Sequence, residues 1–282
     1  MKLILSRKGF DSAAGGCANA IMPDETLLPL PIPDKRSPIR YEQVTTWGYP
    51  VGRIVMNLTR GKQKPHYGAH LDPDLLSSSY PRISGWRPLF GQTDSAQSTL
   101  AGHGVGAGDL FLFFGWFRNI EEYAGEFRFV KGAPDLHVLW GWLQVDHVLT
   151  VATGHMPAWA ADHPHVASPD HGTRNTLYIS RDTLVIDGAS TRLPGAGLFK
   201  TYDERLRLTK AGANRSVWSL PSWFAPTDGR LPLGYHSDVA RWSRDGDRTE
   251  LRSVGRGQEF VLDTRQYPES PGWVRDLIAL DQ

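Results

Sequence analysis

Residues suited to ligand chemistry follow the first apolar segment of the chain. An apolar run at residues 2–6 predicts a buried strand, and the sequence SRKGFDS continues from its end. A polar glycine turn after a strand is a common place for a ligand, so Arg7 and Lys8 could hold an anionic group such as phosphate. Asp11 could hydrogen-bond a sugar or a base edge. The nucleotide-binding candidates here are Ser6, Arg7, Lys8, Asp11 and Ser12; the alternative is an ordinary surface turn with an ion pair.

A second polar motif, HYGAHLDPD, occupies residues 66–74. Its two histidines and two aspartates could bind a metal. Gly68 and Pro73 disfavour a helix, however, and we identify no cysteine or distant ligand set that would complete a zinc site. We therefore assign no metal site. A substrate-contacting or turn-forming role is our interpretation for His70, Asp72 and Asp74, with plain loop structure as the alternative.

A glutamate leads the last apolar run, GQEFVLD, at residues 257–263. A carboxylate at the head of a buried strand could serve as a general base or bind ribose. Arg7 or Lys8 could compensate its charge, in which case the pair could also be purely structural. The catalytic candidates from these motifs are Glu259, Asp72 and Asp11.

Two aromatic segments, GAGDLFLFFGWFR and LHVLWGWLQV, follow at residues 106–118 and 136–145. A turn ending in Gly-Asp, an aromatic strand and a second strand resemble the core of PUA-like domains of the EVE and ASCH types, small β-barrels that hold RNA or flipped modified bases. A flipped base needs aromatic walls and a few polar groups. The wall candidates are Phe114, Trp116, Phe117, Trp140 and Trp142, and we assign Trp116 and Arg118 to nucleotide binding. A hydrophobic barrel core is the alternative.

The stretch at residues 195–224 interleaves basic and aromatic side chains, including Lys200, Arg205, Arg207 and Trp218. Such a pattern suits single-stranded or flipped nucleic acid. The alternative is a solvated face whose cations pair with Asp203 and Glu204.

Overall charge limits the class of protein. The 282 residues carry 31 Lys and Arg against 30 Asp and Glu, so overall charge does not favour coating of DNA or of an anionic membrane. Cys17 is the only cysteine, so no intrachain disulfide can form, as is usual in a reducing compartment. No apolar run approaches the roughly 20 residues of a membrane helix. We expect a cytoplasmic protein without a membrane partner.

The elements that must position these residues are mostly strands. The 20 prolines and 29 glycines break long helices. We predict an α+β, mostly β fold with a PUA-like β-barrel component, Pro/Gly-rich loops and a C-terminal helix at residues 273–280. Gly141 predicts a bulge, and the runs at residues 176–179 and 183–186 predict a hairpin. We treat residues 1–282 as one domain, with an alternative internal boundary near residues 155–172.

Taken together, the ordered motifs resemble the third type of nucleotide modification associated domain. The segments that carry the resemblance are SRKGFDS, a Gly15–Gly16 pair, LPLPIPD at residues 28–34, HLDPDL at 70–75, GDLFLFFGWFR at 108–118 and GQEFVLD at 257–263. Residues 17–20 depart from the Ser-Pro step expected there.

The resemblance implies a protein of nucleotide or DNA-base modification, acting on a nucleotide or on a base in nucleic acid, with DNA favoured over RNA. Partner proteins of a modification system are a further expectation, and no cofactor is assigned. A non-catalytic PUA-like reader of a modified base is the alternative to an enzyme.

Overall fold

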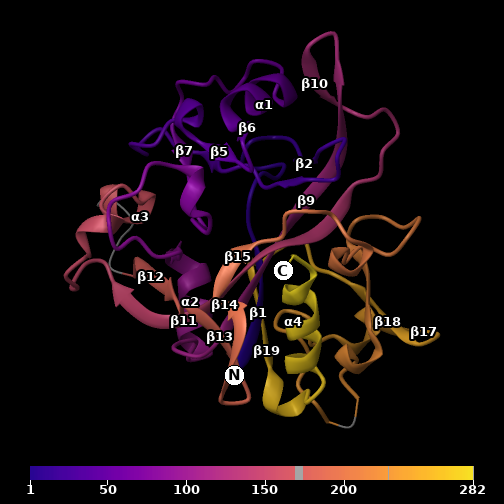
Figure 1. Ribbon diagram of the computed structural model, residues 1–282. Helices are drawn as coiled ribbons and strands as arrows, with labels where there is room; N and C mark the ends of the chain where they lie inside the picture. The colour runs from indigo at the N-terminus through magenta and orange to yellow at the C-terminus, as the bar shows by residue number, and fades with distance from the viewer. Residues whose placement is uncertain (169–173, 228, 282) are drawn as a thin grey trace.

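The computed structural model describes residues 1–168, 174–227 and 229–281. Strands outweigh helices, 37% against 19%, so the predicted mostly β class is confirmed. Figure 1 shows long strands crossing the centre, N-terminal elements gathered at the upper left, and helix α4 packed at the lower right beside the C-terminal strands. The α-helices are α1 (Val51–Leu58), α2 (Asp94–Gly102), α3 (Pro164–Ala167) and α4 (Ser270–Ile278).

Ten of the described strands form one mixed sheet, with the central order β19-β1-β9-β11-β12-β8. These six are β1 (Lys2–Arg7), β8 (Leu89–Gln92), β9 (Leu110–Tyr123), β11 (Leu136–Thr150), β12 (Thr176–Ser180) and β19 (Glu259–Asp263). The other four are β2 (Asn19–Ile21), β3 (Leu27–Leu28), β10 (Glu126–Phe129) and β15 (Ala196–Leu198). Smaller sheets contain β4 (Ile32–Pro33) with β7 (Ala69–His70), β5 (Thr45–Thr46) with β6 (Tyr49–Pro50), β13 (Thr183–Ile186) with β14 (Ala189–Pro194), and β16 (Val217–Pro221), β17 (Trp242–Asp245) and β18 (Arg248–Arg252).

The central sheet curls into a half-barrel. Its two outer strands come within side-chain reach, because Gln92 of β8 donates a hydrogen bond to Glu259 of β19. Aromatic rings from neighbouring strands pack together inside, with Phe113 5.2 Å from Phe90 and 5.5 Å from Trp140 between ring centroids. The aromatic run of β9 therefore forms core, as its continuous apolar character indicates.

A second core forms under α1, which buries Val51, Ile54, Val55 and Leu58. These positions repeat at intervals of three and four residues, which places them on one helical face. The helix ends in a tight turn in which Arg60 and Gly61 have φ values of 53° and 76°. At this turn the chain leaves the core, so the basic residues Arg60 and Lys62 after α1 are exposed.

Several expectations for single elements can be compared with these strands. The bulge predicted at Gly141 is confirmed by a register shift in the β11–β9 pairing, and the C-terminal helix is confirmed as α4. The predicted hairpin is wrong: β12 pairs with β11 and β8, and β13 pairs with β14. The short turn between β12 and β13 does not make them partners, because a strand's partner depends on the whole sheet.

The PUA-like component and the division into domains stay predictions. Within the boundary considered at residues 155–172, residues 155–168 include α3 with its buried His165. Residues 169–172 lie outside the described residues.

Candidate functional site

Glu259 lies at the seam of the half-barrel, opposite Ser6 in the β1–β19 register. Only 1% of the residue is exposed. Its Oε1 accepts hydrogen bonds from Ser6 Oγ at 3.1 Å and Gln92 Nε2 at 2.6 Å, and Lys8 Nζ lies 3.0 Å away. Oε2 is buried and accepts no hydrogen bond from the described part of the chain. We call Ser6, Lys8, Gln92 and Glu259 the Glu259 cluster, in which one cation and two hydrogen-bond donors surround a buried carboxylate.

The remaining candidates of the first motif have other partners. The Arg7 guanidinium donates to the carbonyls of Val254 and Gly255 at 2.9 and 2.7 Å, and burial lowers its pKa. Asp11 Oδ1 accepts from the backbone N–H groups of residues 13 and 14 at 2.7 and 2.6 Å. Ser12 is exposed on this turn. Arg7 thus ties the end of β1 to the loop that precedes β19, and Asp11 shapes the turn.

A second cluster gathers around Asp72. His70 Nε2 and His165 Nε2 lie 3.8 and 3.6 Å from Asp72 Oδ2, and His163 Nε2 lies 3.2 Å from Oδ1. Three of these residues, His70, Asp72 and His165, place one possible ligand atom each within 4.8 Å of one another. We call the four residues the His–Asp cluster. Their side chains are between 2% and 12% exposed, so they meet in a largely water-free environment.

The outer contacts of this cluster are also specific. His70 Nδ1 lies 2.9 Å from Asp34 Oδ2, and this hydrogen bond lowers the pKa of Asp34 to about 2. Burial lowers the pKa of His165 to about 3, so its imidazole is neutral at neutral pH. Burial alone would raise the pKa of Asp72, but the hydrogen bond from His163 and the neighbouring imidazoles lower it overall.

Sequence reasoning placed His70 and Asp72 in one motif but missed their partners on and beside α3. His163 and His165 lie 91 and 93 residues after Asp72, in the segment considered above as an alternative domain boundary. The signal available was the pattern His-Pro-His. Asp74, by contrast, has a structural partner, because Arg82 donates to both of its carboxylate oxygens.

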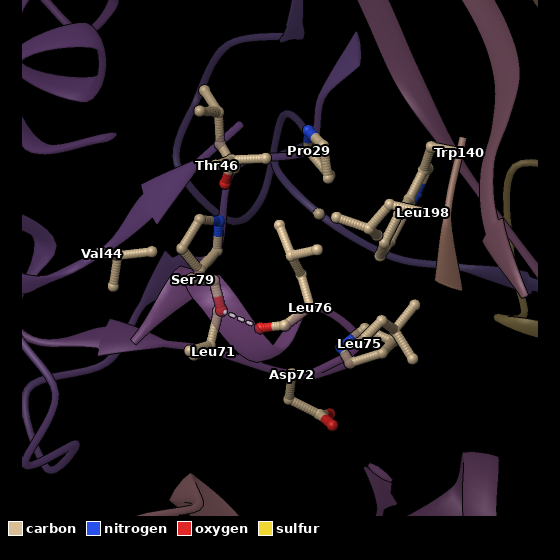
Figure 2. A pocket seen from close by; sticks show the side chains of 14 residues that line it. Pro29, Val44, Thr46, Leu71, Asp72, Leu75, Leu76, Ser79, Trp140 and Leu198 are labelled. Carbon is tan, nitrogen blue, oxygen red and sulfur yellow. Dashed lines mark hydrogen bonds between the residues drawn. The ribbon is translucent and has the colours of Figure 1, made fainter. Parts of the chain in front are cut away.

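A small cavity lies between the first and second motifs (Figure 2). Gly9, Asp72, Trp140 and Leu198 are among its lining residues, and its volume is about 30 Å³. That volume holds a water molecule or two but no nucleobase. In Figure 2 the Asp72 carboxylate points away from the apolar side chains, so it is not part of this cavity's chemistry. Phe114, Phe117, Trp140 and Trp142 are at most 2% exposed and form core.

A larger, polar cleft of about 340 Å³ lies beside the end of α1. We call it the basic cleft. Its cations are Arg60, Lys62 and Arg118, and its aromatic walls are Trp116 and Phe129. No carboxylate lines it, and within the described residues none of the three cations is in an ion pair. The cleft is therefore electropositive and has aromatic surface, a combination suited to a phosphate and a base.

The glycine pair of the first loop forms another side of the basic cleft, together with Cys17. Gly16 has a φ of 77°, and a Cβ at this position would meet no atom within 4 Å. The backbone is thus open to close approach by a ligand. Trp116 is held by a hydrogen bond from Nε1 to Asp135 at 2.8 Å, and the Arg215 guanidinium lies 4.3 Å from its ring.

A second cleft, of about 780 Å³, shares Lys62 with the basic cleft. Its other lining residues include Asp34, Lys35, Arg40 and His66. Since Asp34 also bonds His70, the His–Asp cluster lies behind the wall of this second cleft.

The basic stretch at residues 195–224 is largely neutralised by its own acids. Arg205 pairs with Asp203 at 2.7 Å, and Arg207 pairs with Glu204 at 2.6 Å. The Asp203 pKa is lowered to about 2, chiefly by the hydrogen bond from Arg205. These contacts match the solvated, paired face considered as the alternative.

Comparison with known proteins gives one match. The family model for nucleotide modification associated domain 3 matches residues 2–263 of the 282. No curated protein and no solved structure matches the chain. No helix in the described ranges has the length and apolar character needed to cross a membrane. Because the model covers most of the sequence, the chain belongs to the family of nucleotide modification associated domain 3.

Proposed function

We propose that this protein binds a nucleotide, or a nucleotide unit of a nucleic acid, in the basic cleft and acts on it in nucleotide modification. The observation that carries the proposal is the presence of Arg60, Lys62 and Arg118 around a 340 Å³ space with no lining carboxylate. Pockets of this size hold small ligands and cofactors. The membership of the family, whose name refers to nucleotide modification, supports the same substrate class.

Two motifs of the family resemblance meet at this cleft. Gly15 and Gly16 come from the first loop, while Trp116 and Arg118 come from β9. In this arrangement the cations bind phosphate oxygens and the aromatic side chains contact the base. We favour DNA over RNA as the polymeric substrate, and partner proteins of a modification system remain part of the proposal.

The choice between an enzyme and a reader depends on ionisable groups. Four of the five wall candidates are core, which leaves Trp116 as the partly exposed ring among those five. Glu259 and Asp72 are buried carboxylates with positioned partners, as catalytic groups often are. We therefore favour an enzyme and keep Glu259, Asp72 and Asp11 as its catalytic candidates, none of which lines the basic cleft. Asp11 supports the loop that carries Gly15 and Gly16.

Isothermal titration with nucleoside phosphates and short single-stranded DNA and RNA tests the proposal. Arg60→Gln and Lys62→Gln should each weaken binding by about tenfold to a hundredfold, because a charge-assisted hydrogen bond contributes about 1.5–3 kcal/mol. Arg205→Gln is the matched control, since Arg205 is paired with Asp203 outside the cleft. Absence of binding at low salt, or variants that all bind like the wild type, would refute the proposal.

A further inference from the structure

Hydrogen bonds to neighbouring residues determine which ring nitrogens of the His–Asp cluster face Asp72. Asn175 Nδ2 donates to the His165 carbonyl at 2.7 Å, which turns Asn175 Oδ1 toward His165 Nδ1, also at 2.7 Å. An amide oxygen only accepts, so His165 Nδ1 carries the proton. The basic nitrogen Nε2 is then the one that faces Asp72 Oδ2.

The same reasoning applies to His70. Its Nδ1 donates to the carboxylate of Asp34, which leaves Nε2 as the nitrogen directed at Asp72. Nε2 of His70 and Nε2 of His165 therefore approach one carboxylate oxygen, Asp72 Oδ2, at 3.8 and 3.6 Å. Two imidazole nitrogens and one carboxylate oxygen, the atom types that bind first-row metal ions, thus converge within 4.8 Å of one another from β7, the following loop and α3.

The other oxygen of Asp72 is already used. Its Oδ1 accepts the backbone N–H of Gly91 at 2.7 Å, and His163 Nε2 lies 3.2 Å away. His163 Nδ1 accepts the backbone N–H of His165 at 3.4 Å. Oδ2 alone is thus directed at the two histidines.

We propose that His70 Nε2, His165 Nε2 and Asp72 Oδ2 bind one divalent transition-metal ion. Metal–ligand distances of about 2.0–2.2 Å place neighbouring donors about 3.0–3.5 Å apart. The two nitrogen–oxygen separations, 3.8 and 3.6 Å, are a few tenths of an ångström longer, and the two imidazole nitrogens lie within 4.8 Å of each other. Imidazole donors select Zn²⁺, Fe²⁺ or another first-row ion over Mg²⁺ and Ca²⁺. Two histidines and one carboxylate leave coordination positions open, as in catalytic zinc and non-haem iron sites.

The outer contacts support this assignment independently of the ligand distances. Metal-binding histidines almost always donate their second ring nitrogen to a carboxylate, a carbonyl or water, which fixes the tautomer and the ring orientation. Here each ligand histidine has such an acceptor, Asp34 for His70 and Asn175 for His165. The inference does not depend on nucleotide binding in the basic cleft, because metal content is measured without a nucleotide.

The experiment uses the full chain, purified without a polyhistidine tag and stripped with a chelator. Titration with Zn²⁺, Fe²⁺ under anaerobic conditions, and Co²⁺ should give one equivalent bound, with a Co²⁺ visible spectrum that reports nitrogen and oxygen ligands. His70→Ala should abolish binding. His66→Ala is the matched control from the same motif, since His66 is exposed and lies outside the cluster. Asp34→Asn should weaken affinity about 10–100-fold through the orientation of His70.

Circular dichroism distinguishes loss of the site from unfolding, and His165→Gln provides a second ligand variant that keeps a polar side chain. A rise in melting temperature with metal in the wild type, absent in His70→Ala, is expected because an ion that binds only the folded state stabilises it. The proposal is overturned if no ion binds stoichiometrically, if His70→Ala binds like the wild type, or if His66→Ala removes binding.

Discussion

At the scale of single residues, Glu259 and Lys8 form a buried ion pair, so removing one charge leaves the other buried without a counter-charge. Replacing Glu259 with Gln keeps the shape but leaves the Lys8 ammonium, with 11% of its side chain exposed, without a counter-charge. We expect Glu259→Gln to lower the free energy of unfolding by about 1–3 kcal/mol, measured by urea denaturation. If Glu259 is also a general base, turnover should fall about 10²–10⁴-fold once the substrate is identified.

Lys8→Met and the Lys8→Met/Glu259→Gln double variant complete the comparison. The double variant buries no unpaired charge. Its decrease in the free energy of unfolding should therefore be smaller than the sum of the decreases in the two single variants, with a coupling energy of about 0.5–3 kcal/mol. Strict additivity of the two losses would show that the ion pair contributes nothing.

The sequence predicted part of this residue-scale chemistry. A strand-end cation near Glu259 was expected, and Lys8 is that cation, while Arg7 binds carbonyls instead. The partners of His70 were not predicted, since nothing local to residues 66–74 indicates where His165 will lie. Contacts between neighbouring strands can follow from motif order, whereas contacts that depend on a distant loop cannot.

At the scale of elements, β8 connects the two clusters. Gly91 donates its N–H to Asp72, and the next residue, Gln92, donates its side chain to Glu259. A Cβ at Gly91 would point at the His165 ring, whereas the Gln92 side chain reaches Glu259. Because successive side chains of a strand point to opposite faces, His165 and Glu259 lie on opposite faces of β8. Gly91 allows this arrangement, because a Cβ there would lie 2.4 Å from the His165 ring.

We therefore expect Gly91→Ala to destabilise the protein by about 1–3 kcal/mol through overpacking. Gly102→Ala, at the end of α2, is the control, because a Cβ at Gly102 would meet nothing within 4 Å. That variant should be neutral or slightly stabilising, since alanine loses less conformational freedom on folding than glycine. Thermal unfolding measures the stability of both variants. Equal melting temperatures for Gly91→Ala and Gly102→Ala would contradict the close packing of β8 on α3.

Elements were predictable where the apolar pattern is continuous. The strands β1, β9, β11 and β19 follow from such runs. Helix α1 was not predicted because Pro50 and Gly52 at its start suggest a turn, although its apolar face is regular. The β12–β13 hairpin was wrongly predicted because a short turn between two strands does not specify pairing.

At the scale of the whole molecule, the sheet's curl brings together motifs that are far apart in sequence. The motifs at residues 6–12, 70–74 and 257–259 divide between two clusters. The first and third meet at the seam through Ser6, Lys8 and Glu259, while the second forms the His–Asp cluster across β8. The basic cleft unites Gly15–Gly16 with Trp116 and Arg118. Motif order alone could not predict this division, which depends on how far the sheet curls.

The central claim, that a nucleotide occupies the basic cleft, is tested most directly by the chain's single cysteine. Cys17 lines this cleft, and burial raises the pKa of its thiol to about 11, so alkylation should be slow and its rate easy to follow by mass spectrometry. We predict that a bound nucleoside phosphate slows alkylation of Cys17 further, saturating at the concentration that saturates binding, and that Arg60→Gln shifts both curves together. A nucleotide that binds tightly while the Cys17 alkylation rate stays unchanged would contradict this site.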